Sequence, residues 1–341
     1  MDWPTQDLVA ARAAATPDRT ALIDADRDET LTYRAYDAAV GRRAAALAAL
    51  AGSDEPDRIA FLLDTRPAVA ELFFAAMRLG SSVVPLNVRL TPAEVTEQIE
   101  RTDPDALVCE RETESTATEV FDGPTASVDA PKRDGVRALD DIDTAPVEPA
   151  TLTPRTEQLV MFTSGTTGRP KGVRLTVGNL VASATASAFR LGVSPGDRWL
   201  CCLPTYHMGG LAPVVRSALY GSTVVVQREF DAAATARVLD EYGITGVSLV
   251  PTMLSRLLDA GWGPSEQLRF VLLGGAPASD DLLARARERD VPACPTYGMT
   301  ETASQIATAT PEQAATHRGT VGQPLVNTTV TVVDEDGDPV G

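Results

Sequence analysis

The sequence contains very little lysine, histidine or cysteine. Only two of its 30 basic residues are lysines, Lys132 and Lys171, and the chain has two histidines and four cysteines. No two cysteines are spaced as a CxxC pair, which argues against a zinc site. We therefore expect buried free thiols in a reducing compartment.

Long apolar runs and a surplus of positive charge are also missing. No run reaches the roughly 18 apolar residues that a bilayer requires, and the N-terminus lacks the basic start and apolar stretch of a secretory signal. With 47 acidic against 30 basic residues the net charge is −17, so the chain is expected to repel nucleic acid. These absences predict a cytoplasmic protein with no membrane or nucleic-acid partner.

Short β-rich runs alternate with amphipathic helical segments along most of the chain. This alternation predicts an α/β fold with two similar lobes, each a mostly parallel sheet covered by helices. The predicted strands are 58–64, 81–86, 106–110, 159–163, 198–203, 222–227, 246–250 and 269–274. The predicted helices are 67–79, one that begins at Thr91-Pro92, 177–191, 210–220, 231–242, 252–260 and 279–289.

The predicted division of the chain has three parts. Residues 1–155 form the first α/β lobe, which ends in a loose acidic connector at 111–153. Residues 156–320 form the second lobe. Residues 321–341 are the start of a small β-barrel-like subdomain, because 328–341 resembles a strand that enters an acidic glycine turn and stops before its partner strand. We expect from this that the sequence is a fragment.

The strongest chemical motif is TSGTTGRPKGV, which follows the predicted buried strand 159–163. Glycines allow close approach to a ligand, hydroxyls donate hydrogen bonds and lysine adds a positive charge, so the segment is typical of a phosphate-binding loop. It is not a Walker A loop, since Pro170 precedes the lysine and Gly172 follows it. The candidate phosphate-binding residues are Thr163, Ser164, Gly165, Thr166, Thr167, Gly168 and Lys171.

Four further motif-like segments follow the phosphate loop along the chain. They are LPTYHMGGL (203–211), LLGGAP (272–277), YGMTETASQ (297–305) and VGQPL (321–325). Together with the phosphate loop they resemble the adenylate-forming acyl-CoA synthetase, luciferase and peptide-synthetase superfamily. Within it, the sequence is most similar to 2-succinylbenzoate–CoA ligases of menaquinone biosynthesis, in HMGGL, VPTMLSRLL (250–258), GGAP and MTETASQI (299–306).

The resemblance implies a reaction in two steps. A carboxylate attacks the α-phosphate of ATP to give acyl-adenylate and pyrophosphate, and the thiol of CoA then displaces AMP. The implied ligands are ATP, Mg²⁺, CoA as cosubstrate and a small carboxylic acid. Because an anion must approach a triphosphate, backbone donors and cations are expected to carry the catalysis, and no side-chain nucleophile is needed.

The resemblance also implies roles for single residues. Lys171 and its loop would hold the β- and γ-phosphates, Thr300 would bond the α-phosphate, and Glu301 would ligate Mg²⁺. His207 would lie at the acyl pocket, near the attacking carboxylate. The catalytic candidates are thus Lys171, His207, Thr300 and Glu301. Tyr297 would lie against adenine, and the opposite wall would consist of Gly274, Gly275, Ala276 and Pro277. Gly298 and Thr300 are further cofactor-binding candidates.

Several questions stay open at this level. The family's downstream ribose-binding Asp, hinge and C-terminal lid domain are absent from this sequence, so one alternative is a nucleotide-binding fragment with little turnover. Another is a CoA ligase for a different aryl or fatty acid. An aromatic dicarboxylate also needs a cation for its second carboxylate, and 28 arginines are candidates. A homodimer is expected from the resemblance alone.

The scarcity of lysine beside many acidic residues predicts a halophilic protein. We expect the melting temperature to rise as KCl is increased towards molar concentration, because screening weakens the repulsion among 17 excess negative charges. Thermal unfolding followed by circular dichroism across a KCl series checks this expectation. A flat or falling melting temperature would contradict it.

Overall fold

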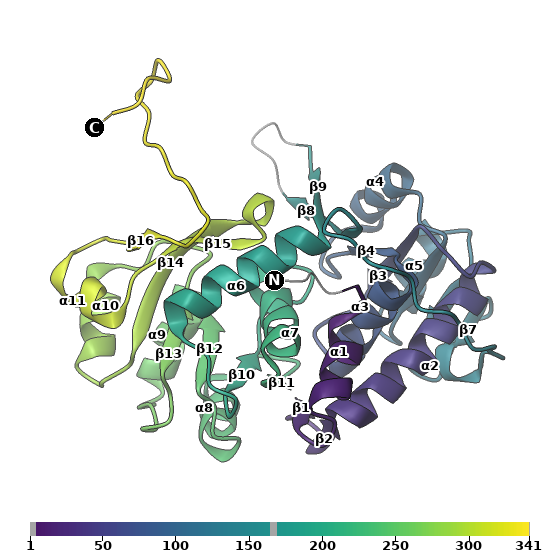
Figure 1. Ribbon diagram of the computed structural model, residues 1–341, viewed down its shortest axis with the longest axis horizontal. Coiled ribbons are helices and arrows are strands. Elements are labelled where there is room, and N and C mark those ends of the chain that lie inside the picture. The colour runs from purple at the N-terminus through teal and green to yellow at the C-terminus, as the bar shows by residue number, and fades with distance from the viewer. Residues whose placement is uncertain (1–4, 164–168, 341) are drawn as a thin grey trace.

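Two β-sheets organise the protein (Figure 1). The computed structural model describes residues 5–163 and 169–340. One sheet has the strand order β7-β6-β5-β3-β4-β8-β9 and the other β16-β15-β14-β13-β12-β10-β11-β1-β2. Strands pair in parallel except for β2, β9, β15 and β16, which lie at or next to sheet edges and pair antiparallel. The predicted α/β class with two mostly parallel sheets is therefore confirmed.

The strands of the first sheet are β3 (Arg58–Leu62), β4 (Ser82–Pro85), β5 (Ala106–Cys109), β6 (Thr125–Ser127), β7 (Val136–Ala138), β8 (Glu157–Thr163) and β9 (Lys171–Thr176). Those of the second are β1 (Thr20–Asp24), β2 (Glu29–Thr32), β10 (Arg198–Cys201), β11 (Thr223–Val226), β12 (Gly246–Leu249), β13 (Phe270–Leu273), β14 (Ala293–Met299), β15 (Ser304–Thr308) and β16 (Gln323–Pro324).

The helices are α1 (Leu8–Ala15), α2 (Tyr33–Ala51), α3 (Pro67–Leu79), α4 (Pro92–Thr102), α5 (Glu114–Val120), α6 (Val177–Leu191), α7 (Met208–Tyr220), α8 (Ala232–Glu241), α9 (Pro251–Asp259), α10 (Asp280–Arg287) and α11 (Pro311–Thr316). Two short 3₁₀ turns are η1 (Leu139–Asp141) and η2 (Thr300–Thr302). No helix in the described ranges is long and apolar enough to cross a membrane.

One layer of helices separates the two sheets. Buried residues of α1, α2, α3, α6 and α7 join the inner faces of both sheets in a single apolar core, and α6 and α7 lie between the sheets (Figure 1). Helices α4 and α5 cover the outer face of the first sheet, and α8, α9 and α10 that of the second. Side chains along β3 point alternately to the two faces of the sheet. Ile59 and Phe61 face the shared core, whereas Ala60 and Leu62 face α4.

The local start and stop signals explain why several predicted helices are confirmed to the residue. Helix α3 begins at Pro67 and ends before Gly80, whose φ of 72° suits a left-handed cap. Helix α4 begins after Thr91, which forms a capping box with Glu94. Helix α6 begins after a similar box between Thr176 and Asn179.

Sheet membership departs from the predicted division at residue 155 in two places. The hairpin β1–β2 near the N-terminus pairs with β11 of the second sheet. The strand that precedes the phosphate loop, β8, pairs with β4 of the first sheet, and the loop joins it to the antiparallel strand β9. Each sheet therefore contains strands from the part of the chain that the predicted division at residue 155 assigned to the other sheet. The local sequence pattern of a strand does not determine which strand it pairs with.

The prediction of a loose connector over 111–153 is partly wrong. This stretch contains α5, β6, β7 and η1, and β6 and β7 extend the first sheet beyond β5. Few large apolar residues are needed because these elements are short and pack on an existing sheet edge. Near the C-terminus, by contrast, the predicted strand from 328 is absent from the described residues; an isolated bridge joins Val333 to Pro339 around the acidic turn, and the segment leads away from the body (Figure 1).

A buried ion network connects the carboxyl ends of strands from both sheets. The Glu110 carboxylate, which is 2% exposed, accepts hydrogen bonds from Arg66 at 2.8 Å and from Arg228 at 2.7 Å. Arg66 also binds both carboxylate oxygens of Asp129 at 2.9 Å, and this pairing holds the pKa of Asp129 at about 2. Arg66 follows β3 of the first sheet and Arg228 follows β11 of the second, so Glu110 joins the two.

We expect Glu110→Gln to lower the free energy of unfolding by roughly 3 kcal/mol, because it leaves two guanidinium groups without their shared carboxylate. The neighbouring Glu112→Gln makes the same chemical change at an exposed side chain and is expected to have little effect. Urea unfolding of both variants measures the difference. Equal losses of stability in the two would contradict the assigned role of Glu110.

Candidate functional site

A cavity of about 430 Å³ opens at the carboxyl ends of β10, β12, β13 and β14. In open parallel sheets this edge is where ligands commonly bind, since the loops that follow the strands converge there. The lining is mainly apolar and glycine-rich, and it also includes polar side chains. It includes Leu203, His207, Met208, Arg216, Ser248, Leu249, Val250, Leu272, Gly274, Gly275, Thr296, Gly298, Met299, Thr300, Ser304 and Gln305.

His207 lies where the turn after β10 enters helix α7. Its backbone N–H donates to Pro204 O at 3.1 Å, and its ring packs edge-on against Tyr206 with centroids 5.0 Å apart. Gly210 allows this turn to lie directly on the helix, because a Cβ there would be 2.3 Å from Pro204 O and 2.4 Å from Leu203 O. Within HMGG, the glycine at position 210 is thus required for packing, independently of any chemical role of the motif.

The imidazole of His207 is exposed at the cavity mouth. Desolvation by the surrounding walls lowers its pKa, and the positive charge of Arg89 lowers it further. The lowered pKa favours the neutral ring, which offers one donor and one acceptor nitrogen.

The opposite wall is formed by the glycines that follow β13. A Cβ on Gly274 would be 2.8 Å from Thr296 Cγ2, and Gly275 has a φ of 79°, which disfavours other residues. Both glycines line the cavity, whereas Ala276 and Pro277 continue the loop as exposed residues outside the lining.

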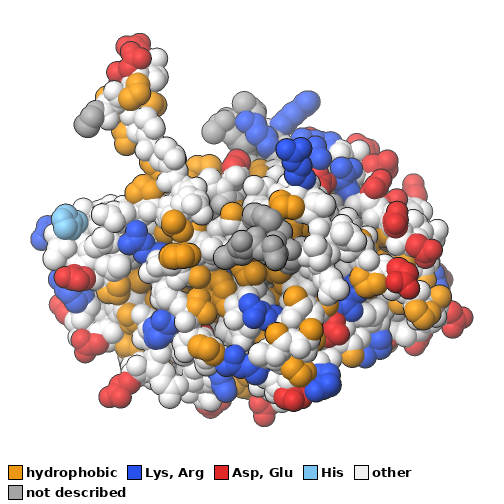
Figure 2. Space-filling model, viewed as in Figure 1, with side chains coloured by type: hydrophobic (Ala, Val, Ile, Leu, Met, Phe, Trp, Pro, Cys, Tyr) orange, Lys and Arg blue, Asp and Glu red, His pale blue; other side chains and the backbone are white. Residues whose placement is uncertain are grey.

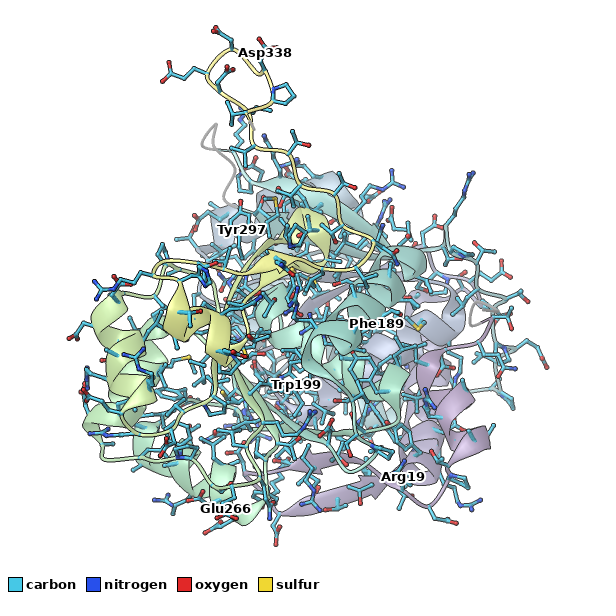
Figure 3. All side chains as sticks on the ribbon, turned by 60° about the vertical axis from the view of Figure 1, so that its left-hand side comes forward. Arg19, Phe189, Trp199, Glu266, Tyr297 and Asp338 are labelled. Carbon is cyan, nitrogen blue, oxygen red and sulfur yellow. The ribbon has the colours of Figure 1, made fainter. Side chains whose placement is uncertain are left out.

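The segment from Tyr297 to Ser304 forms a tight, irregular hairpin between β14 and β15. A bulge falls between Tyr297 and Gly298, where a Cβ on the glycine would be 1.7 Å from Ser304 O. Ala303 and Ser304 have positive φ angles of 53° and 119°. Backbone strain of this kind concentrates at functional sites. Gly298 and Thr300 line the cavity, and the ring of Tyr297 is exposed beside it (Figure 3).

The phosphate-loop hairpin approaches this segment from the other sheet. Thr163 and Lys171 pair across β8 and β9, and β9 contacts η2, which holds Thr300 and Glu301. Residues Ser164, Gly165, Thr166, Thr167 and Gly168 lie outside the described residues. Arg101 of α4 donates to Pro170 O beside Lys171. Lys and Arg side chains gather over this hairpin and α4 (Figure 2), on an otherwise acidic chain.

Arg216 is the functional candidate that sequence reasoning missed. It lines the cavity and is 2% exposed. Its Nη2 donates to Ser304 Oγ at 3.2 Å, and its guanidinium lies 5.1 Å from the ring centroid of Trp199, which is labelled in Figure 3. Burial lowers the pKa of Arg216, yet arginine stays protonated in proteins. Within the described ranges no carboxylate lies within 4 Å of it.

A signal for Arg216 was present in the sequence. It is the only charged residue of MGGLAPVVRSALY, a helix whose residues are nearly all apolar. A helix that is apolar on every side is buried, so its single charge must be buried with it. Recognising this requires knowing that both faces of α7 are covered, which follows from the shared helical layer.

The comparisons agree on one family. The AMP-binding enzyme family matches residues 9–341. The chain is 36% identical over 329 residues to 2-succinylbenzoate–CoA ligase of Bacillus velezensis, covering 96% of this chain and 65% of that protein.

Two solved structures from Bacillus subtilis are similar in fold. Both are o-succinylbenzoate–CoA synthetase, one with its acyl-adenylate intermediate (TM-score 0.91) and one with ATP and magnesium ion (TM-score 0.90). Each is 34% identical and covers 98% of this chain, which spans 67% and 68% of those chains. The chain thus spans about two thirds of the length of these relatives.

The close contact at Gly210 generates a stability prediction. We expect Gly210→Ala to lower the free energy of unfolding by about 1–3 kcal/mol, because its Cβ collides with backbone oxygens. Gly209→Ala is the matched control, since its Cβ would be 3.2 Å from a flexible Leu203 side chain. Urea unfolding compares them, and a Gly210→Ala protein as stable as Gly209→Ala would refute the packing argument.

Proposed function

This chain belongs to the AMP-binding enzyme family, and we propose that it takes part in ATP-dependent acid–CoA ligation with 2-succinylbenzoate as the acid. The proposed reaction forms an acyl-adenylate with release of pyrophosphate and then transfers the acyl group to CoA. The relatives named above support the reaction class, and the cavity supports the acid.

The observation that carries the choice of acid is the buried charge of Arg216. An apolar cavity accommodates many acids, but a guanidinium without a carboxylate partner is unfavourable unless a ligand pairs with it. 2-Succinylbenzoate has two carboxylates: one is activated and the other stays ionised. A pair between that second carboxylate and Arg216 would form inside a low-dielectric cavity, where charge-assisted hydrogen bonds are strong.

An aryl or fatty acid with a single carboxylate is the alternative substrate. It would fill the apolar part of the cavity, formed by side chains such as Leu249, Val250 and Leu272. Such an acid would leave Arg216 buried without a counter-charge, so its binding is expected to be less favourable than that of a dicarboxylate.

The residues at the mouth fit the adenylation step. Lys171 and the backbone of its loop would hold the phosphates, Thr300 would donate to the α-phosphate, and neutral His207 would orient the attacking carboxylate. The walls at Gly274, Gly275 and Gly298 allow a flat base to approach the backbone closely, with Tyr297, Ala276 and Pro277 at the rim.

Glu301 fits the implied Mg²⁺. Its carboxylate is exposed on η2 beside β9, and in the described part of the chain it has no hydrogen bond or ion pair. Carboxylate and phosphate oxygens are the ligands that Mg²⁺ prefers. When bound, Mg²⁺ supplies charge neutralisation to the triphosphate. A homodimer, a cytoplasmic location and adaptation to salt stay predictions.

We expect Arg216→Met to weaken binding of a stable succinylbenzoyl-adenylate mimic by about 10- to 100-fold, because a charge-assisted pair is lost. Binding of a benzoyl-adenylate mimic should hardly change, since it has no second carboxylate. Without ligand the variant should melt at or above the temperature of the wild type, because a buried charge is removed. Isothermal titration calorimetry and thermal unfolding measure these effects.

Lys171→Ala provides the complementary variant for that experiment. It should weaken ATP binding while leaving the ratio between the two mimics unchanged. Equal weakening of both mimics by Arg216→Met would contradict the choice of acid. No binding of either mimic to the wild type would contradict the proposed function itself.

A further inference from the structure

Thr65 joins the first sheet to the turn that holds His207. It follows β3 and is 1% exposed. Its hydroxyl donates to Leu203 O at 3.1 Å and accepts from the backbone N–H of Thr205, also at 3.1 Å. A single side chain of one sheet thus fixes both a carbonyl and an amide in the segment after β10 of the other sheet.

On its opposite side, that segment packs against helix α7. Leu203 O and Pro204 O lie directly against Gly210 of α7, and His207 N–H donates to Pro204 O. The turn from 203 to 207 is therefore held between helix α7 and the Thr65 hydroxyl. A shift of the turn away from α7 would move His207 relative to the cavity mouth.

Thr65 is itself held rigidly by its neighbours. Its N–H donates to Asp64 Oδ1 at 2.8 Å, and the N–H of Asp64 donates to Glu110 Oε1 at 2.8 Å. The next residue, Arg66, binds Glu110 and Asp129 in the ion network. The position of the hydroxyl is therefore set by the same charges that join the two sheets.

We propose that Thr65 is a positioning residue, whose hydroxyl holds the 203–207 turn so that the His207 ring faces the acyl cavity. The catalytic consequence rests on the proposed function, whereas the effect on the ring does not. No bond to substrate is assigned to Thr65 itself.

Thr65→Val tests the proposal because valine keeps the shape and removes both hydrogen bonds. The chain has only two histidines, so proton NMR of the ring signals reports on His207 directly, with exposed His317 as an internal reference. In Thr65→Val the pKa of His207 should rise towards its ordinary value, because the ring would move away from the cavity walls and from Arg89, which lower it in the wild type. Thr65→Ser should restore the wild-type titration of His207.

Thr223→Val is the matched control. Thr223 is also buried and its hydroxyl donates to Thr20 O at 2.9 Å, but it joins neighbouring strands within the second sheet. The control variant should lose stability without altering the His207 titration. If Thr65→Val is too unstable to titrate, Thr65→Ala gives the same readout. An unchanged His207 titration in either Thr65 variant, or an equal change in Thr223→Val, overturns the proposal.

Kinetic measurements on the Thr65 variants test whether the position of His207 affects catalysis. Pyrophosphate exchange driven by 2-succinylbenzoate should show a kcat at least tenfold lower in Thr65→Val, with KM for ATP within twofold and recovery in Thr65→Ser. A raised KM for ATP with unchanged kcat would overturn the positioning role. If the wild type shows neither exchange nor mimic binding, the proposed function fails, and the NMR titration still decides whether Thr65 sets the position of His207.

Discussion

A parallel sheet needs helices on both faces, and in this protein one helical layer covers the inner faces of two sheets at once. Helix α7 lies within that layer, so most of its residues are buried and its one charged side chain is buried with them. The same helix begins at the cavity mouth with His207 as its N-cap. Arg216 lies nine positions after His207, a rise of roughly 13 Å along the helix. One helix therefore sets the spacing between two of the polar residues that line the cavity.

The two sheets are joined where their strands end, and that is also where the site lies. Glu110 accepts from an arginine of each sheet, and Thr65, one residue before Arg66, bonds to the turn that carries His207. The phosphate-loop hairpin of the first sheet contacts the η2 turn of the second. The candidate site is thus assembled across both sheets, and interactions that stabilise the fold also set the geometry of the site.

Local sequence signals predicted the helices and buried strands well, because caps, prolines and apolar periodicity act within a few residues. The bounds of α3 and α6 and the family are confirmed. The pairing of strands that are distant in sequence could not be predicted, because nothing within β1 or β8 indicates which sheet it joins. The motifs named His207, Gly274, Gly275, Gly298 and Thr300, which the cavity brings together. Arg216 was missed because its importance depends on burial from both sides, a property of the whole fold.

The proposed role of Arg216 is to pair with the second carboxylate of the acid. The most direct measurement compares two ligands on the wild-type protein by calorimetry: a succinylbenzoyl-adenylate mimic with its second carboxylate free, and the same mimic with that carboxylate as a methyl ester. We expect the ester to bind about 10- to 100-fold more weakly, because the buried guanidinium then loses its counter-charge. Equal affinity for the two would show that the second carboxylate does not meet Arg216 and would contradict the account.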